Sequence, residues 1–265
     1  MEIDLIHALN FSPAGHTATA VEAVAKGFGQ TYRMLDISNR ETDFAQWSFD
    51  VNDVCIVGVP SFGGRVPPVA VKRLSAMRAE HTLAVPVVTY GNRAYDDTLL
   101  ELQDTLQERG FTVVAAVTAV AEHTICPAIA HGRPNAADLA ELTGFGKQIK
   151  AYLNSTDIFH NIKLPGNFPY CNYDGVPFKP ETGSKCIKCR RCAMLCPVGA
   201  IPPESPNQTN GKLCITCMRC INICPAKARS LSWLVRFTAQ QKLSKLCTDT
   251  GKNELFIKEL DYAEA

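Results

Sequence analysis

Eight of the twelve cysteines lie between positions 186 and 224, where they form two runs of identical spacing, Cys-x2-Cys-x2-Cys-x3-Cys-Pro. Each cysteine of the second run stands 28 positions after its counterpart in the first, so the runs are an internal repeat. Thiolates at this density bind either zinc or iron–sulfur clusters. Zinc modules usually present pairs of Cys-x2-Cys, so a triple run that ends in Cys-Pro favours [4Fe–4S] clusters. The eight candidate ligands are Cys186, Cys189, Cys192, Cys196, Cys214, Cys217, Cys220 and Cys224.

The double run is similar to the motif of bacterial two-cluster ferredoxins, in which the fourth cysteine of each run ligates the other cluster. This resemblance implies a small α+β ferredoxin-like domain that holds two clusters. The implied ligands are Cys186, Cys189, Cys192 and Cys224 for the first cluster, and Cys214, Cys217, Cys220 and Cys196 for the second.

The cysteine region is basic, with eight Lys or Arg side chains and one acidic residue, Glu204, between Lys185 and Arg229. A cluster bound by four thiolates is negatively charged, so a positive environment favours its reduced form and raises its potential. The same charges would steer an acidic redox partner, although they also suit the solvated rim of a small domain. Nucleic acid is not an expected partner, because the chain carries a net charge of only +1 and this stretch has no interleaved aromatic residues.

Three loops in the first half of the chain carry residues suited to a flat, phosphorylated ligand. The first combines hydroxyls and a glycine just before a predicted helix, whose positive end and free N–H groups favour a phosphate. The second has two glycines and a phenylalanine that can stack, and the third has two tyrosines around a Gly-Asn turn. Each could instead be an ordinary turn before a helix. The candidate ligand-binding residues are Ser12, Ala14, Gly15, His16 and Thr17; Pro60, Ser61, Phe62, Gly63, Gly64 and Arg65; and Tyr90, Gly91, Asn92, Arg93 and Tyr95.

Each of these loops follows a predicted strand, which places all three at one edge of a sheet. Short apolar runs without alternation predict five strands buried on both faces, at residues 3–9, 32–37, 54–59, 85–90 and 113–120. Between them, apolar residues recur at helical spacing in stripes that begin at Val21, Val69, Leu99 and Leu139. The alternation predicts a doubly wound α/β fold with a five-stranded parallel sheet, whose ligand binds at the carboxyl ends of the strands.

With these loops, residues 1 to about 153 resemble the flavodoxin family. The resemblance aligns Ser12-Pro13-Ala14-Gly15-His16-Thr17 with the family's phosphate loop, Ser/Thr-x-Thr-Gly-x-Thr, and implies that the domain binds FMN. Ala14 lacks the hydroxyl of the family pattern, which should weaken phosphate binding by about 0.5–1.5 kcal/mol without abolishing it. The resemblance also implies that the other two loops clamp the flavin ring. Phe62, Tyr90 and Tyr95 would be stacking candidates, and Gly63 or Gly64 would reorient toward reduced flavin.

The composition changes near residue 154. We expect a flavodoxin-like FMN-binding domain at 1–154, a Pro/Gly/Asn-rich linker at 155–183 and a ferredoxin-like domain at 184–265 with a helix over 231–246. A chain that is 46% hydrophobic and 20% charged suits a globular protein, and no apolar run approaches the ~20 residues that span a bilayer. The sequence lacks a secretory signal, so we expect a cytoplasmic location and no disulfide framework. No role is assigned to Cys55, Cys126, Cys171 or Cys247.

As a whole, the chain resembles flavodoxin–ferredoxin fusion proteins, which are common in anaerobic microbes. This resemblance implies an electron carrier that passes single electrons between two [4Fe–4S] clusters and FMN, and on to a redox protein partner such as an acidic ferredoxin or reductase. Two alternatives stay open: an FMN-dependent reductase of a small substrate, with Tyr95 or His16 as proton donor, and an iron–sulfur redox sensor. The sequence identifies no catalytic residue and no NAD(P)H site, and it leaves open whether the chain is a homodimer.

Overall fold

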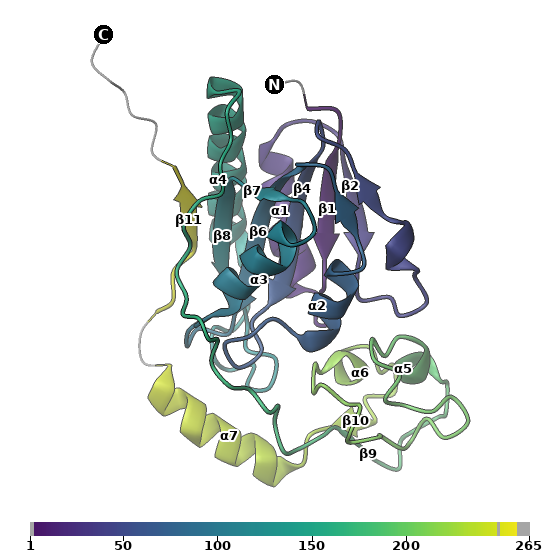
Figure 1. Ribbon diagram of the computed structural model, residues 1–265. Coiled ribbons are helices and arrows are strands. Elements are labelled where there is room, and N and C mark those ends of the chain that lie inside the picture. Colours follow the sequence, from purple (N-terminus) through teal and green to yellow (C-terminus); the bar gives the residue numbers. More distant parts are fainter. Residues whose placement is uncertain (1–2, 248–249, 259–265) are drawn as a thin grey trace.

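The computed structural model describes residues 3–247 and 250–258, and its centre is a seven-stranded sheet (Figure 1). The five main strands run parallel in the order β2-β1-β4-β6-β8. Renumbered along the chain, this is the flavodoxin-like order 2-1-3-4-5 of doubly wound folds. The strands are β1 (Ile6–Asn10), β2 (Tyr32–Asp36), β4 (Val54–Pro60), β6 (Leu83–Tyr90) and β8 (Ala115–Val120). The predicted doubly wound parallel sheet is therefore confirmed.

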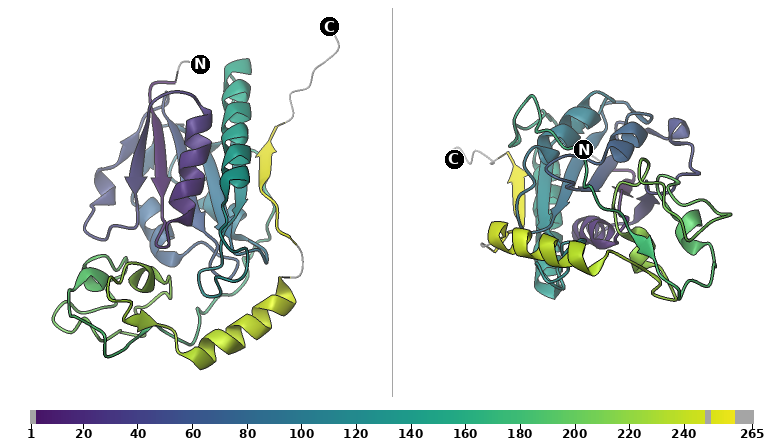
Figure 2. Two further views of the ribbon diagram at one scale, coloured as in Figure 1. Left: turned by 180° about the vertical axis from the view of Figure 1, so that it is seen from behind. Right: turned by 90° about the horizontal axis from the view of Figure 1, so that it is seen from below.

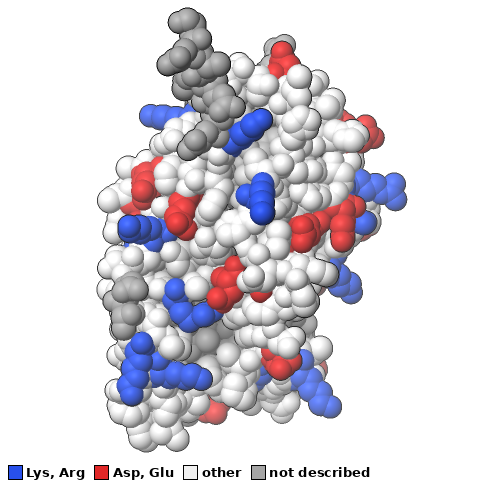
Figure 3. All heavy atoms as spheres, turned by 60° about the vertical axis from the view of Figure 1, so that its left-hand side comes forward, with Lys and Arg blue, Asp and Glu red and all other residues white. Residues whose placement is uncertain are grey.

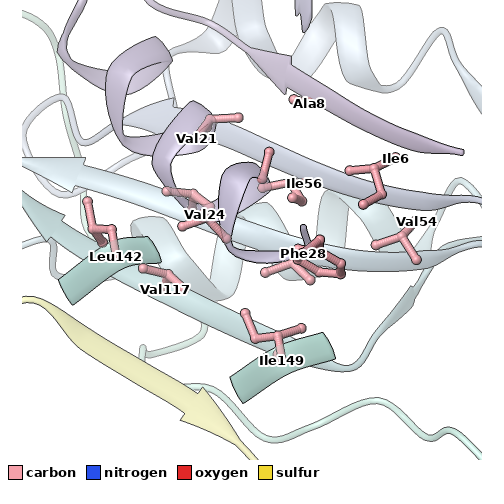
Figure 4. Packing of buried hydrophobic residues seen from close by; sticks show 14 of the residues in the cluster. Ile6, Ala8, Val21, Val24, Phe28, Val54, Ile56, Val117, Leu142 and Ile149 are labelled. Carbon is pink, nitrogen blue, oxygen red and sulfur yellow. The ribbon is translucent and has the colours of Figure 1, made fainter. Parts of the chain in front are cut away.

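Four helices cover the two faces of this sheet. The helices α1 (His16–Gly27) and α4 (Ala136–Ser155) pack on one face, and α2 (Pro68–Leu74) and α3 (Thr98–Gln107) pack on the other. Figure 4 shows the first of these interfaces, where Val24 of α1 and Leu142 of α4 lie over Ile56 and Val117 of the sheet. Because helices bury both faces, the inner strands β4, β6 and β8 are continuous apolar runs, whereas the edge strand β2 carries polar, exposed residues.

Two further strands join the sheet, β7 (Thr112–Val113) and β11 (Glu254–Ile257). The strand β7 contains the first residue of the strand expected at 113–120, which the structure divides in two, and β11 is not expected from the sequence. The strand β7 pairs with the start of β6, and β11 pairs antiparallel with the outer edge of β8. The expected division places residues 184–265 with the cysteines, whereas residues 254–257 complete the sheet of the first domain. The strand β11 has only four residues, too few for its hydrophobic pattern to predict a strand. It pairs with β8 because the outer edge of β8 offers backbone N–H and C=O groups that no other strand among the described residues pairs.

The remaining elements are short, apart from one long helix. A corner beside the sheet contains η1 (Phe44–Gln46) and the paired strands β3 (Ser48–Phe49) and β5 (Arg78–Ala79). The cysteine region contains α5 (Arg191–Met194), α6 (Arg219–Asn222) and the paired strands β9 (Glu181–Thr182) and β10 (Arg229–Ser230). The helix expected over 231–246 is α7 (Trp233–Leu246). Across residues 3–247 and 250–258, none of the helices has the length and apolar character needed to cross a bilayer.

The cysteine region and α7 lie beyond the end of the sheet where the parallel strands finish (Figures 1 and 2). A buried arginine of α2, Arg73, links the two parts, because its guanidinium donates to the carbonyl of Ile37 at 2.7 Å and to that of Pro197 at 2.6 Å. Arg40 adds a hydrogen bond of 3.3 Å to the carbonyl of Ala193. These contacts fix the cysteine loops against the edge of the sheet.

The contact between α1 and α4 depends on a small residue. A Cβ on Gly146 would lie 2.1 Å from the carbonyl oxygen of Val24, whereas a Cβ on Gly144 of the same helix would meet no atom within 4 Å. We expect Gly146→Ala to lower the free energy of unfolding by about 1–3 kcal/mol through overpacking. Gly144→Ala, the matched control, should raise it by up to about 1 kcal/mol. Urea unfolding followed by circular dichroism measures both, and equal effects of the two substitutions would contradict this account.

Candidate functional site

A cavity of about 640 Å³ opens at the carboxyl ends of the parallel strands. This volume is in the usual range for small-molecule and cofactor sites. The lining joins the three predicted loops to residues from the loop after β8, the linker, a cysteine loop and α7. The predicted ligand-binding residues that line it are Ala14, His16, Thr17, Pro60, Ser61, Phe62, Gly63, Gly64, Tyr90, Gly91 and Arg93.

Five predicted residues do not line the cavity: Ser12, Gly15, Arg65, Asn92 and Tyr95. The guanidinium of Arg65 donates to both carboxylate oxygens of Glu101, at 2.8 and 2.7 Å. The hydroxyl of Tyr95 donates to Glu254 at 3.2 Å. These two side chains therefore support the walls from behind, and Tyr95 is not placed to donate a proton to a ligand in the cavity.

The loop between β1 and α1 forms one end of the cavity. Gly15 precedes the helix with a φ of +100°, a conformation that favours glycine. The hydroxyl of Ser12 accepts from the amide of Ala18 at 2.9 Å, and the buried Oγ1 of Thr17 lies 2.7 Å from that of Thr89. The first amides of a helix have no intrahelical partner, so this loop keeps donors available for an anionic group.

Aromatic rings form two other walls. Phe62 comes from the loop after β4 and Tyr90 from the end of β6, as expected, while Tyr173 comes from the linker. The ring of Tyr173 lies against Gly63, where an added Cβ would be 2.1 Å from it. The hydroxyl of Tyr90 donates to the carbonyl of Lys252 at 2.9 Å, so the segment before β11 holds this ring in place. Burial raises the pKa of Tyr90.

The loop after β8 brings His123 to the cavity, a residue that the sequence did not single out. Its Nδ1 accepts from the amides of Ile125 at 3.3 Å and Cys126 at 3.2 Å. A Cβ on Gly91 would lie 2.5 Å from Cδ2 of His123, so the ring fills the space beside that glycine. Burial lowers the pKa of His123 and favours the neutral ring. Its position directly after the fifth predicted strand was the available signal.

A cysteine loop forms part of the same cavity. Thr216 and Cys217 both line it, and so does Leu243 of α7. Lys179 of the linker joins the two walls, because its Nζ donates to the Oγ1 of Thr216 at 3.0 Å and to the carbonyl of Val176 at 2.9 Å. A cysteine of the second run thus lies on the wall of the cavity that the sheet loops form.

The structure gathers the eight cysteines into two groups of four. One small cavity is lined by Cys186, Cys189, Cys192 and Cys224. In the other group, burial and the neighbouring thiols of Cys196, Cys220 and Cys214 raise the pKa of Cys217 to about 12. The last cysteine of each run therefore lies with the first three of the other run. Among the described side chains, no three of His, Cys, Asp or Glu are arranged to hold a single metal ion.

The sequence repeat is also a repeat of backbone conformation. Lys188 and Arg190 have φ values of 53° and 63°, and their counterparts 28 positions later, Thr216 and Met218, have 57° and 62°. Non-glycine residues adopt positive φ rarely, and such residues persist where the surrounding structure requires them. Both runs therefore wrap the space between their cysteines in the same way.

Backbone amides point at the sulfur atoms that end each run. The amide of Ala200 donates to Sγ of Cys196 at 3.3 Å, and the amide of Ala228, 28 positions later, donates to Sγ of Cys224 at 3.2 Å. Against the opposing effect of burial, amides that include Ala228 and Arg229 lower the pKa of Cys224. Hydrogen bonds of this kind stabilise thiolates and adjust the potential of a cluster that they bind.

Residues 185–229 match the family described as 4Fe-4S dicluster domain. Among curated proteins, none matches this sequence significantly. The match covers both cysteine runs and indicates that this region binds 4Fe–4S clusters, as expected from the sequence.

Several solved structures are similar to the first domain at low identity. A flavodoxin from the domain Archaea is 15% identical, covering 57% of this chain and 99% of that chain with a TM-score of 0.43. Rubredoxin oxygen:oxidoreductase from the anaerobe Desulfovibrio gigas is 16% identical, covering 58% and 37% with a TM-score of 0.44. The flavodoxin of Streptococcus pneumonia TIGR4 is 14% identical, covering 56% and 99% with a TM-score of 0.41. The chain joins a flavodoxin-like fold, shown by its strand order, to a 4Fe-4S dicluster domain.

The lowered pKa of His123 predicts a pH dependence of stability. The unfolded chain binds this proton more readily, so the contribution of neutral His123 is complete above about pH 6.5. That contribution is lost as the pH falls through the lowered pKa, by at most about 1.4 kcal/mol per pH unit. We expect the Tm to fall more steeply between about pH 7 and pH 5.5 in the wild-type chain than in His123→Asn. Parallel pH profiles of the two proteins would contradict this assignment.

Proposed function

We propose that this chain is an electron-transfer protein that binds FMN in the large cavity and one [4Fe–4S] cluster in each group of four cysteines. The proposal rests mainly on one observation: Cys217 lies on the wall of the cavity that the loops after β1, β4 and β6 form. A flavin there would adjoin a cluster-binding loop of the same chain. Flavins take two electrons and iron–sulfur clusters exchange one at a time, so the two complement each other.

The cavity residues fit FMN in kind and position. The start of α1, where His16 and Thr17 line the cavity, would hold the phosphate through backbone amides. Phe62, Tyr90 and Tyr173 provide aromatic faces for a flat ring system. Tyr90 is buried, and Phe62 and Tyr173 are partly buried, so the faces of these rings are largely held within the protein.

The cysteine groups fit cubane clusters. The cysteines of the first group line a small cavity, and those of the second group lie close together. In each group an amide donates to a sulfur atom, and the backbone between the cysteines has an uncommon conformation. The proposed ligands of the first cluster are Cys186, Cys189, Cys192 and Cys224, and those of the second are Cys196, Cys214, Cys217 and Cys220. The second group adjoins the flavin cavity, so the first group is the outer one.

The outer group is exposed to a partner. Cys189 is exposed, and Ile187 and Met194 beside it expose 68% and 66% of their surfaces. Lys188 and Arg191, which neighbour Ile187 and Cys192 in the sequence, are also exposed and add positive charge to this part of the chain. On the face shown in Figure 3, basic and acidic side chains are interspersed. A redox partner with an acidic surface would therefore dock at the outer cysteine group.

The first test is the cofactor content of protein purified without oxygen. We expect about eight iron atoms and one FMN per chain. Cys217→Ser should lose about half of the iron, because it removes one ligand of the inner cluster. The control is Cys171→Ser, which changes a half-buried cysteine outside both groups and should keep all of the iron. Wild-type protein that contains zinc and no iron, or iron and no flavin, would overturn the proposal.

A second test concerns the docking surface. With an acidic ferredoxin as electron donor, Lys188→Gln/Arg191→Gln should slow second-order reduction of the clusters about tenfold at low salt. Added salt should reduce this difference, since it screens the charges. Lys26→Gln/Lys147→Gln on α1 and α4 removes the same net charge and should leave the rate nearly unchanged. Equal slowing in both variants would show that net charge, and not this surface, controls the reaction.

A further inference from the structure

Arg229 is a buried cation whose hydrogen-bond partners include no carboxylate. It is 3% exposed. Within the described residues its four hydrogen bonds go to the carbonyls of Pro206 at 2.7 Å and Gln208 at 3.0 Å, the hydroxyl of Thr209 at 2.9 Å and Sγ of Cys220 at 3.9 Å. Its Nε is buried and has no partner among these residues. A buried guanidinium is costly unless an anion compensates its charge.

Arg229 lies beside residues of both cysteine groups. Arg229 is among the residues that line the small cavity of Cys186, Cys189, Cys192 and Cys224, and its Nη1 donates to Sγ of Cys220 in the inner group. Pro206, whose carbonyl accepts from the Nη2 of Arg229 at 2.7 Å, lines the same small cavity. In the described structure, this one guanidinium therefore contacts the surroundings of both proposed clusters.

The internal repeat is broken at this residue. The counterpart of Arg229, 28 positions earlier, is Ile201, which is 2% exposed. Equivalent positions after the two cysteine runs thus hold an apolar side chain, Ile201, after the first run and a cation, Arg229, after the second. Packing alone does not require the charge, because the equivalent site is filled by isoleucine.

We propose that Arg229 is the shared counter-charge of the two clusters and that it raises their reduction potentials. This inference rests on the proposed function, since it needs clusters in both groups. A cluster bound by four thiolates carries net negative charge, and each added electron makes it more negative, so a fixed buried cation stabilises the reduced form more than the oxidised form. The low dielectric of the buried site strengthens this effect relative to that of exposed cations. Arg229 acts through the ligands and is a positioning and tuning residue, not a catalytic one.

The test is a redox titration, followed by EPR, of the full chain prepared without oxygen. Arg229→Ile introduces the residue of the equivalent site, and Arg229→Lys keeps the charge. We expect Arg229→Ile to shift the oxidised-to-reduced equilibrium of the clusters at least tenfold toward the oxidised form, equivalent to a 59 mV lower potential for one electron. Arg229→Lys should shift this equilibrium by less than half as much, on a logarithmic scale, as Arg229→Ile does. Arg191→Gln, which removes an exposed charge from the first run, should shift the equilibrium by less than threefold.

The outcomes separate the inference from the proposed function. If wild-type protein contains no iron, the proposed function itself fails. If Arg229→Ile keeps its iron and shifts no further than Arg191→Gln, the counter-charge role is wrong. If Arg229→Ile loses iron and Arg229→Lys keeps both the iron and the wild-type potential, the positive charge is needed and the inference is supported. Loss of iron in both variants would show that only the shape and hydrogen bonds of arginine matter, which overturns it.

Discussion

The fixed contact between the cysteine loops and the carboxyl edge of the sheet is the constraint on which this structure depends. Electron exchange between two buried groups requires that they be held close together, and the linker alone would not ensure it. Arg73 provides the central contact, because its buried guanidinium bridges a carbonyl after β2 and the carbonyl of Pro197 next to Cys196. Arg219 adds an ion pair of 3.9 Å with Asp36, and Lys179 connects the linker to Thr216. Breaking these contacts would leave buried polar groups unsatisfied, so the contacts favour one arrangement.

The two parts of the chain are stabilised by different means. The sheet domain has an extensive apolar core on both faces, with residues such as Phe11 and Phe28 fully buried. The cysteine region buries few large apolar side chains, among them Ile201 and Met218, and its elements are two to four residues long. Small domains with so little core usually need metal or covalent links. If the proposed clusters are present, metal binding and folding would be coupled there, and the clusters would balance the charge of Arg229.

The sequence predicted the parts of the fold that local pattern determines. The five main strands, the four sheet helices, α7 and the repeat of the cysteines all appear where the patterns placed them. It could not predict contacts that depend on distant residues. Arg65 and Tyr95 do not line the cavity, because their side chains hydrogen-bond to Glu101 and Glu254, which are 36 and 159 positions away in the sequence. Tyr173 lies in a linker that has no hydrophobic periodicity, so the sequence gives no sign of its position. Its ring packs on Gly63 and so forms part of the cavity wall.

Electron exchange between the flavin and the inner cluster within one chain is the step on which the proposed function depends. It is tested most directly by flash photolysis, in which the light-excited bound flavin is reduced by an added sacrificial amine donor and the absorbance of the clusters is followed. The account predicts that cluster absorbance falls with a first-order rate that does not change when the protein concentration is raised tenfold. A rate proportional to protein concentration, or clusters that stay oxidised after the flavin is reduced, would contradict it.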